Sequence, residues 1–262
     1  PAVLFRDAYY QFAWQHVPDL HNYDVIIQSG NNPGWYIPKD GQVIVKYTHS
    51  PPRNPYDQFH ATISTDHHSL DLGARASNLV KRVYTKAARQ LYEANTAYPD
   101  VYVANSDLVA RRINQAWDIP KDDIEVVYPP VPVSEYSPSE GGDYYLGLSR
   151  LTEKKGFDEI IEAFRHHRDK ELVIAGDGEY RSQLEARARG LDNIRFTGYV
   201  SDERKRDLME GAKALVYAAH NEDFGLVPVE AMAAGTPVIG VDEGFTSQQI
   251  VDGKNGRTFP RE

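Results

Sequence analysis

The chain has no cysteine, and this absence excludes three kinds of chemistry. None of its 262 residues can form a disulfide, supply a thiolate to a metal or act as a cysteine nucleophile. The sequence also shows no apolar run long enough to span a bilayer and no leader of charged and then apolar residues. From these absences we expect a cytoplasmic protein.

A basic excess is lacking as well. The chain carries 29 lysines and arginines against 38 aspartates and glutamates, a formal net charge of -9. A protein that binds nucleic acid needs a net positive face for the phosphate backbone. The sequence therefore argues against a nucleic-acid partner.

What the sequence does contain is a regular alternation of short apolar runs with amphipathic stretches. Parallel strands need a crossover, usually a helix, so this alternation predicts α/β domains with parallel sheets. Helices are predicted over residues 77–98 and 156–167, where apolar side chains recur at a period of 3.6. The predicted strands are residues 24–29, 42–49, 100–106, 124–130, 144–149, 171–176, 194–199, 214–219 and 236–241.

The composition changes between the two sets of strands. Residues 129–143 are rich in Pro, Ser and Gly and have no sustained period, which is typical of a linker. We therefore predict two Rossmann-like domains, residues 1–135 and 136–262. Such sheets bind ligands beyond the carboxyl ends of their strands, so the two domains are expected to face each other across a cleft.

Cations and glycines follow two of the predicted strands. Arg150 and Lys155 come after the strand 144–149 and before a helix, an arrangement that suits an anion site. A solvated turn is the alternative. Gly176 and Gly178 lie at the end of the strand 171–176, but the third glycine of a dinucleotide fingerprint is missing, so a tight strand-to-helix turn is favoured over an NAD site.

The stretch NEDFGLVPVEAMAAGTPVI places Glu222 before a short helix and Glu230 within its first turns. Pro228 suits the first turn, and Gly235 ends the helix. A carboxylate accepts two hydrogen bonds from a vicinal diol, and a helix N-terminus favours phosphate. The pattern indicates a nucleotide-sugar site. In the alternative, Glu230 only complements the helix dipole and Glu222 is solvated.

These motifs also carry a family resemblance. From Asp143 to Phe259 the chain resembles the retaining glycosyltransferases of family 4, including mannosyltransferase-like members. The matching blocks are LSRLTEKKGFDEIIEAF, LVIAGDGEY, IRFTGYVSDE and the two glutamates of E-DFGLVPV-E, followed by AMAAGTPVI. The resemblance implies the GT-B fold of two Rossmann-like domains.

The resemblance also implies a role for each matching residue. Glu230 is expected to bind the donor ribose and Glu222 the donor sugar. Arg150 and Lys155 are expected to hold the diphosphate. The other expected donor-binding residues are Gly176, Tyr199, Phe224, Gly225, Leu226 and Thr246.

The first half resembles the family less strongly. VKYTHSPPR is similar to the family's strand that ends in histidine, which implies that His49 faces the donor sugar. A capped loop histidine is the alternative. His60, Asp66, His67 and His68 match no established zinc spacing, so we expect no metal site.

Two features depart from the family pattern. The loop EGFTSQQIVDGKNG has glutamine where an acid is usual, which weakens the expectation of a phosphate contact there. The chain opens at Pro1 and lacks the family's longer first domain and its last helix. It is therefore expected to be a fragment or to have a small first domain that lacks much of the acceptor site.

The resemblance implies transfer of a hexose, with mannose preferred to glucose, from a GDP- or UDP-linked donor to a glycan or glycolipid hydroxyl. Retention at the anomeric carbon and no metal or other cofactor are expected. Peripheral membrane contact through the basic helix face from Lys81 to Arg89 is a further possibility, although a solvated face is favoured. Two alternatives stay open, a nucleotide-sugar-binding protein without turnover and, less favoured, a Rossmann oxidoreductase. The oligomeric state is not predicted.

Overall fold

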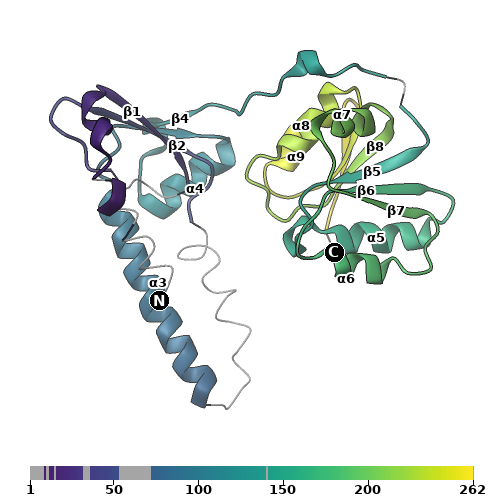
Figure 1. The fold of residues 1–262 in the computed structure, drawn as a ribbon, viewed down its shortest axis with the longest axis horizontal. Helices are drawn as coiled ribbons and strands as arrows, with labels where there is room; N and C mark the ends of the chain where they lie inside the picture. The colour runs from purple at the N-terminus through teal and green to yellow at the C-terminus, as the bar shows by residue number, and fades with distance from the viewer. Residues whose placement is uncertain are drawn as a thin grey trace. The chain divides into compact units, whose positions relative to one another are not determined.

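The computed structural model describes residues 9, 12–14, 16–31, 36–52, 72–139 and 141–261, with only the backbone of residues 72–82 and 84. The chain forms two compact units, Pro1–Tyr128 and Pro129–Glu262. Each unit contains one sheet in which all paired strands are parallel (Figure 1). The predicted α/β class with two parallel sheets is therefore confirmed.

The described part of the first unit forms a four-stranded sheet in the order β1-β2-β3-β4. Helix α3 (Leu72–Asn95) connects β2 to β3, and α4 (Asp107–Trp117) connects β3 to β4. Ser106 caps α4 by accepting a hydrogen bond from the amide of Val109 at 3.1 Å. The strands are β1 (Val25–Gly30), β2 (Val43–Thr48), β3 (Val101–Ala104) and β4 (Ile124–Val126).

One face of β2 changes from apolar to polar along the strand. Ile44, Lys46 and Thr48 all lie on this face and are all buried. Lys46 is only 3% exposed, and no ion pair to it occurs within the described ranges. Because burial disfavours the ammonium, the pKa of Lys46 is lowered to about 8.

The second unit has six strands in the order β10-β9-β8-β5-β6-β7. The chain runs from β5 outward to β7 and then crosses to β8 on the other side of β5. The order therefore reverses between β5 and β8, as at the ligand-binding switch point of doubly wound folds. The strands are β5 (Tyr144–Leu148), β6 (Glu171–Ala175), β7 (Ile194–Gly198), β8 (Ala212–Tyr217), β9 (Val238–Val241) and β10 (Gly256–Phe259).

Helices cover both faces of the six-stranded sheet (Figure 1). This explains the unbroken apolar run in β6, where Leu172 and Ile174 join one buried cluster and Val173 and Ala175 join the other. One face carries α5 (Phe157–His166) and α6 (Arg181–Arg187); the other carries α7 (Asp202–Glu210), α8 (Leu226–Ala233) and α9 (Thr246–Gln249).

The sequence reasoning missed β10. Gly256–Phe259 pairs with β9 in parallel, although GRTF contains no apolar run that would indicate a strand. An edge strand has one partner and needs less apolar surface than a central one, so its sequence signal is weak.

Among the described residues, no helix combines the length and the apolar character that a membrane-spanning helix requires.

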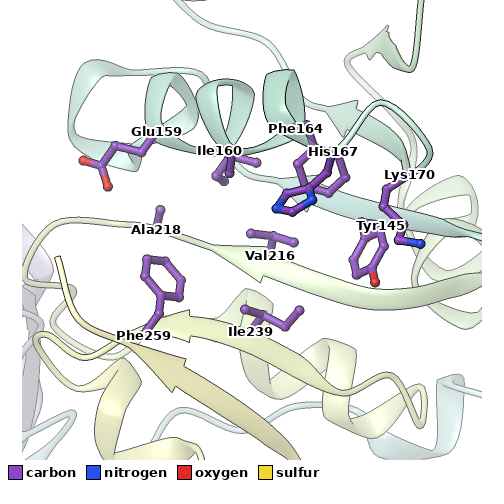
Figure 2. A pocket seen from close by; sticks show the side chains of 11 residues that line it. Tyr145, Glu159, Ile160, Phe164, His167, Lys170, Val216, Ala218, Ile239 and Phe259 are labelled. Atoms are coloured by element: carbon purple, nitrogen blue, oxygen red, sulfur yellow. The ribbon is translucent and has the colours of Figure 1, made fainter. Parts of the chain in front are cut away.

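Helix α5 does not fully cover the face of the sheet on which it packs. Between α5 and strands β5, β8, β9 and β10 lies an apolar pocket of about 410 Å³ (Figure 2). None of the residues predicted for donor binding lines it. Its apolar lining includes Tyr145, Ile160, Phe164, Val216, Ile239 and Phe259.

Candidate functional site

The predicted donor-binding residues of the second unit all follow the carboxyl ends of strands, or lie on the helix after such a strand. Because parallel strands end at one edge of the sheet, this places them along one edge. Lys155, in the 3₁₀ turn Glu153–Lys155, follows β5, while Glu222 follows β8. These two strands are neighbours at the point where the strand order reverses.

The loops at this edge pack backbone against backbone, which explains the glycines of the motif. Gly176 has a φ of 127°, and a Cβ there would overlap the carbonyl oxygen of Ser149. A Cβ on Gly156 would likewise overlap the carbonyl oxygen of Ala218. The glycines therefore let the loops after β5, β6 and β8 approach one another.

Lys155 and Glu222 are in direct contact at the centre of this edge. Lys155 Nζ lies 2.5 Å from Glu222 Oε2, and the same oxygen accepts a hydrogen bond from the Tyr217 hydroxyl at 2.7 Å. Burial and the charge of Glu222 hold the pKa of Tyr217 well above its usual value. Within the described residues no hydrogen bond reaches Glu222 Oε1, so this oxygen is available to a ligand.

Glu230 lies on α8 in a separate polar cluster. Its Oε1 accepts a hydrogen bond from Lys205 Nζ at 2.8 Å, and Lys205 also lies 3.4 Å from Asp202 Oδ1. Burial lowers the pKa of Lys205, but the hydrogen bond and charge of Glu230 outweigh it, and the net shift is upward. Burial and the nearby charge of Glu230 both raise the pKa of Tyr136.

Tyr136 comes from the segment that the sequence marks as a linker. This segment packs on the second unit through polar contacts with α7. Glu135 pairs with Arg206 at 2.9 Å, and the amide of Ser137 donates to Glu210 Oε1 at 2.7 Å. Neither Tyr136 nor Lys205 was predicted as a site residue, because neither lies in a recognisable motif.

Arg150 is placed differently from Lys155. Its side chain is 74% exposed, and Nη2 lies 3.5 Å from Glu179 Oε2 on the loop after β6. An exposed pair of this kind contributes little to stability, so the guanidinium is free to reorient. Tyr199, after the edge strand β7, is 83% exposed.

The backbone before α8 is held by a side chain that the motif did not single out. Gln249 Nε2 donates to the carbonyl oxygens of Phe224 at 2.8 Å and Gly225 at 3.3 Å. A carboxylate could not donate these bonds, which gives the departure from the family pattern a physical consequence. The ring of Phe224 stacks on Phe245 with centroids 5.4 Å apart.

The remaining predicted residues of this region differ in exposure. Leu226, the first residue of α8, is 43% exposed. Gly225 caps that helix with a φ of 80°, a conformation that favours glycine. Thr246 is fully buried, and its hydroxyl finds no hydrogen-bond partner in the structure as described. The Thr246 side chain is therefore not accessible to a donor in this conformation.

His49 belongs to the first unit and follows β2. It is exposed, its Nε2 lies 2.8 Å from Ser29 Oγ, and its ring meets Tyr47 edge-on at 5.6 Å. Arg53 of the same motif lies outside the described residues.

The cluster His60, Asp66, His67 and His68 also lies outside the described residues. Among the residues whose side chains are described, no group of three or more His, Asp or Glu side chains could hold a metal ion.

Comparison with protein families gives a match over the second unit. Residues 134–262 match the model of the glycosyl transferases group 1. An α-1,3/1,6-mannosyltransferase ALG2 of Dictyostelium discoideum is 24% identical over 225 residues, 69% of this chain and 54% of that protein. A phosphatidyl-myo-inositol mannosyltransferase of Mycobacterium leprae is 39% identical over 128 residues, 45% of this chain and 33% of that protein.

Solved structures match both units. The Anabaena protein Alr3699/HepE in complex with UDP-glucose aligns with a TM-score of 0.62 and 20% identity, over 93% of this chain and 66% of that one. The predicted GT-B-like fold is thereby confirmed. The chain spans about half the length of the ALG2 relatives that it matches. The second unit belongs to the glycosyl transferases group 1, the family that the matching sequence blocks predicted.

Proposed function

We propose that this chain is the donor-binding part, with some of the acceptor side, of a retaining glycosyltransferase. It transfers a hexose from a nucleoside diphosphate sugar to an acceptor hydroxyl. The observation that carries this proposal is the Lys155–Glu222 contact at the strand-order reversal between β5 and β8. Doubly wound sheets bind their ligands at this position.

The donor is held by groups of both signs. Glu230 accepts hydrogen bonds from the ribose hydroxyls with the oxygen that Lys205 does not occupy. The diphosphate lies near Lys155 and the N-terminus of α8, where backbone amides and the helix dipole favour an anion. Arg150 reorients from its exposed position toward the diphosphate. Gly176, Tyr199 and Thr246 stay proposed donor contacts, Thr246 only through its backbone.

The same groups act on the transition state. As the bond between sugar and phosphate breaks, negative charge grows on the diphosphate, and Lys155 and Arg150 stabilise it. Glu222 offers Oε1 to the sugar, on which positive charge develops. Lys155 and Arg150 supply the charge stabilisation that a divalent metal gives in other transferases, so we propose a metal-independent transfer. The leaving phosphate helps to deprotonate the acceptor on the same face.

The relatives support a hexose donor. Two of them are named mannosyltransferases, and one solved neighbour holds UDP-glucose. We therefore propose mannose or glucose on a GDP or UDP carrier. The name of the phosphatidyl-myo-inositol mannosyltransferase supports a glycolipid or glycan as the acceptor. In this proposal residues 1–135 bind the acceptor, and His49 faces the donor sugar. Residues 136–262 bind the donor.

Nucleotide-dependent stability tests the donor site. At one hundred times its dissociation constant, a nucleotide should stabilise the folded chain by about 2.7 kcal/mol. We expect thermal stabilisation by UDP or GDP and less by ADP, and its loss in Glu230→Ala. Glu203→Ala, an exposed acid on α7, is the matched control. If Glu230→Ala retains full stabilisation, the ribose assignment is wrong.

Hydrolysis of the donor separates an enzyme from a binding protein. Glycosyltransferases transfer the sugar slowly to water when no acceptor is present, so the wild-type chain should release UDP or GDP from the matching donor. Stabilisation by the nucleotide with neither hydrolysis nor transfer would identify a nucleotide-sugar-binding protein instead.

A further inference from the structure

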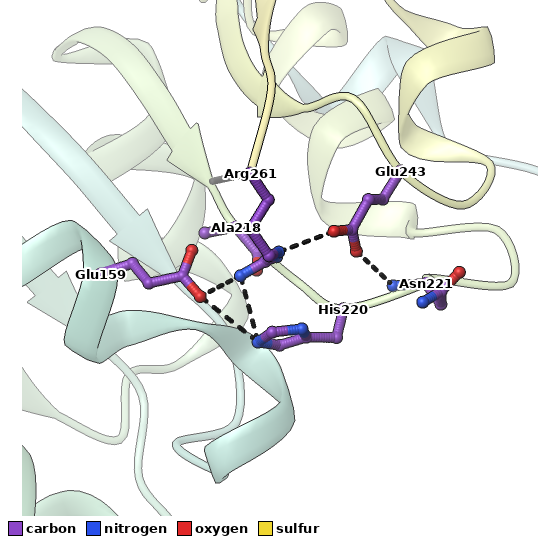
Figure 3. Close-up of polar contacts among 6 residues, drawn as sticks. All are labelled: Glu159, Ala218, His220, Asn221, Glu243 and Arg261. Carbon is purple, nitrogen blue, oxygen red and sulfur yellow. Dashed lines mark hydrogen bonds and ion pairs between the residues drawn. The ribbon is translucent and has the colours of Figure 1, made fainter. Parts of the chain in front are cut away.

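Arg261 follows β10 and joins several segments of the second unit. Its side chain is only 17% exposed. Figure 3 shows its guanidinium between Glu159 and Glu243. Nε donates a hydrogen bond to Glu243 Oε1 at 2.7 Å, and Nη2 donates to the carbonyl of Ala218 at 2.8 Å. Nη1 pairs with Glu159 on α5. One guanidinium thus connects α5 with the loops after β8 and β9.

These two loops frame Glu222. The amide of Asn221 lies 3.4 Å from Glu243 Oε2, and Asn221 has a φ of 46°, in the left-handed region. The amide of Phe245, on the loop after β9, donates to the carbonyl of Glu222 at 2.8 Å. The backbone on both sides of Glu222 is therefore bonded to the loop that Arg261 holds through Glu243.

The loop after β8 is also bonded to the turn that carries Lys155. The amide of His220 donates to the carbonyl of Lys154 at 2.8 Å, and His220 Nε2 lies 3.1 Å from Arg261 Nη1 (Figure 3). Contacts from Arg261 thus reach the segments that bear both members of the Lys155–Glu222 pair.

We infer that Arg261 is a positioning residue for the proposed transfer, which fixes the loop after β8 so that Glu222 meets Lys155 and the donor sugar. The inference rests on the proposed function. Arg261 acts through Glu243, His220 and the backbone, and it makes no contact with Glu222 itself within the described part of the chain. Its planar fork serves partners in several directions, which a single lysine ammonium cannot do.

Substitution of Arg261 tests this role in the full chain. We expect Arg261→Met to lower kcat for hydrolysis of GDP-mannose or UDP-glucose by about 10- to 100-fold, because a small misplacement of a reacting group is costly. The KM for the donor should change less than kcat, since Glu230 is untouched. Arg261→Lys, which keeps the charge and one or two contacts, should restore part of the rate.

A second readout does not depend on activity. Hydrogen exchange of the amides in residues 219–223 and 243–246 should become faster in Arg261→Met, because local opening costs less when the bridging contacts are lost. Arg257→Met is the matched control, since Arg257 on β10 is exposed and forms no ion pair in the described ranges. The control should keep kcat within about twofold.

The outcomes separate this inference from the proposed function. Equal kcat and equal exchange in Arg261→Met and Arg257→Met would overturn the inference. A wild-type chain that neither hydrolyses a donor nor is stabilised by a nucleotide would overturn the proposed function, and the exchange comparison would still decide whether Arg261 holds the loops. If Arg261→Met does not fold, Arg261→Lys and Glu243→Gln carry the same comparison.

Discussion

Lys155 Nζ and Glu222 Oε2 lie 2.5 Å apart, although the two residues are separated by 67 positions in the chain. Their side chains are 26% and 20% exposed, so the pair is largely shielded from water. Under the proposed function, a donor diphosphate would meet a lysine whose charge is already shared with a carboxylate. The contact therefore bears on stability and, under the proposed function, on catalysis.

A double-mutant cycle on this pair should show a measurable coupling. We expect Lys155→Met and Glu222→Gln each to lower the free energy of unfolding by about 1–2 kcal/mol, because each substitution leaves the other, largely buried group without its ion-pair partner. The coupling energy between the two substitutions should be about 1 kcal/mol. Urea unfolding followed by circular dichroism measures this. The exposed pair Arg165–Glu162 is the control and should couple by no more than about 0.5 kcal/mol. Additive effects of the two substitutions at 155 and 222 would contradict the interpretation.

Lys205 should matter for nucleotide binding although no motif contains it. Lys205→Met removes the group that holds Glu230 Oε1 at 2.8 Å. We expect the dissociation constant for UDP or GDP to rise about 10-fold, which corresponds to about 1.4 kcal/mol. Isothermal titration measures it. Asp202→Asn changes an 85% exposed partner of Lys205 and should leave binding nearly unchanged; equal losses in both variants would count against this role.

Lys46 should make stability depend on pH in a defined direction. Its pKa falls from 10.5 to about 8 on folding, so between these values the unfolded chain binds more protons and stability rises with pH. The burial cost, about 3 kcal/mol at pH 7, disappears as the pH approaches 10.5. The free energy of unfolding of Lys46→Met, relative to that of the wild type, should therefore fall by about 3 kcal/mol between pH 7 and pH 10.5.

Tryptophan fluorescence during urea unfolding is a suitable probe, because all three tryptophans lie in the first unit. Lys86→Met, an exposed lysine on α3, is the matched control. If the difference in the free energy of unfolding between Lys46→Met and the wild type stays constant across this pH range, folding does not lower the pKa of Lys46.

Gly176→Ala should be far more costly than an alanine at another glycine of positive φ. At Gly176 the new Cβ overlaps the carbonyl of Ser149, whereas at Gly190, with φ of 75°, nothing lies within 4 Å. We expect Gly190→Ala to lower the free energy of unfolding by about 1 kcal/mol, from backbone strain alone, and Gly176→Ala to lower it by about 3 kcal/mol or more. Thermal unfolding distinguishes them, and similar melting temperatures would argue against the close approach of the loops.

The secondary structure was largely predictable because burial imposes a local pattern. Residues 172–175 are apolar without a break since β6 is covered on both faces, and the apolar period of residues 156–167 gave α5. The edge strand β10 escaped because its single partner requires no apolar run. The four matching blocks together, above all the two-glutamate motif, were sufficient to identify the family.

The contacts of the site were not predictable in the same way. Glu230 meets Lys205 from α7 and Tyr136 from the linker, and Arg261 reaches Glu159 across 102 positions. No local period links such residues. Their proximity depends on the strand order, which brings β8 beside β5 and the segment after β10 beside the loop after β8.

The sequence by itself thus determined nine of the ten described strands, the helices α3, α5 and α8, and the glycines and acids of the donor motif, because hydrophobic burial and backbone sterics act over a few neighbouring residues. Only the tertiary structure decided which cation neutralises which acid. Charges in a protein pair with whatever partner the packed sheet brings within a few ångströms, and that distance is set by topology rather than by spacing along the chain.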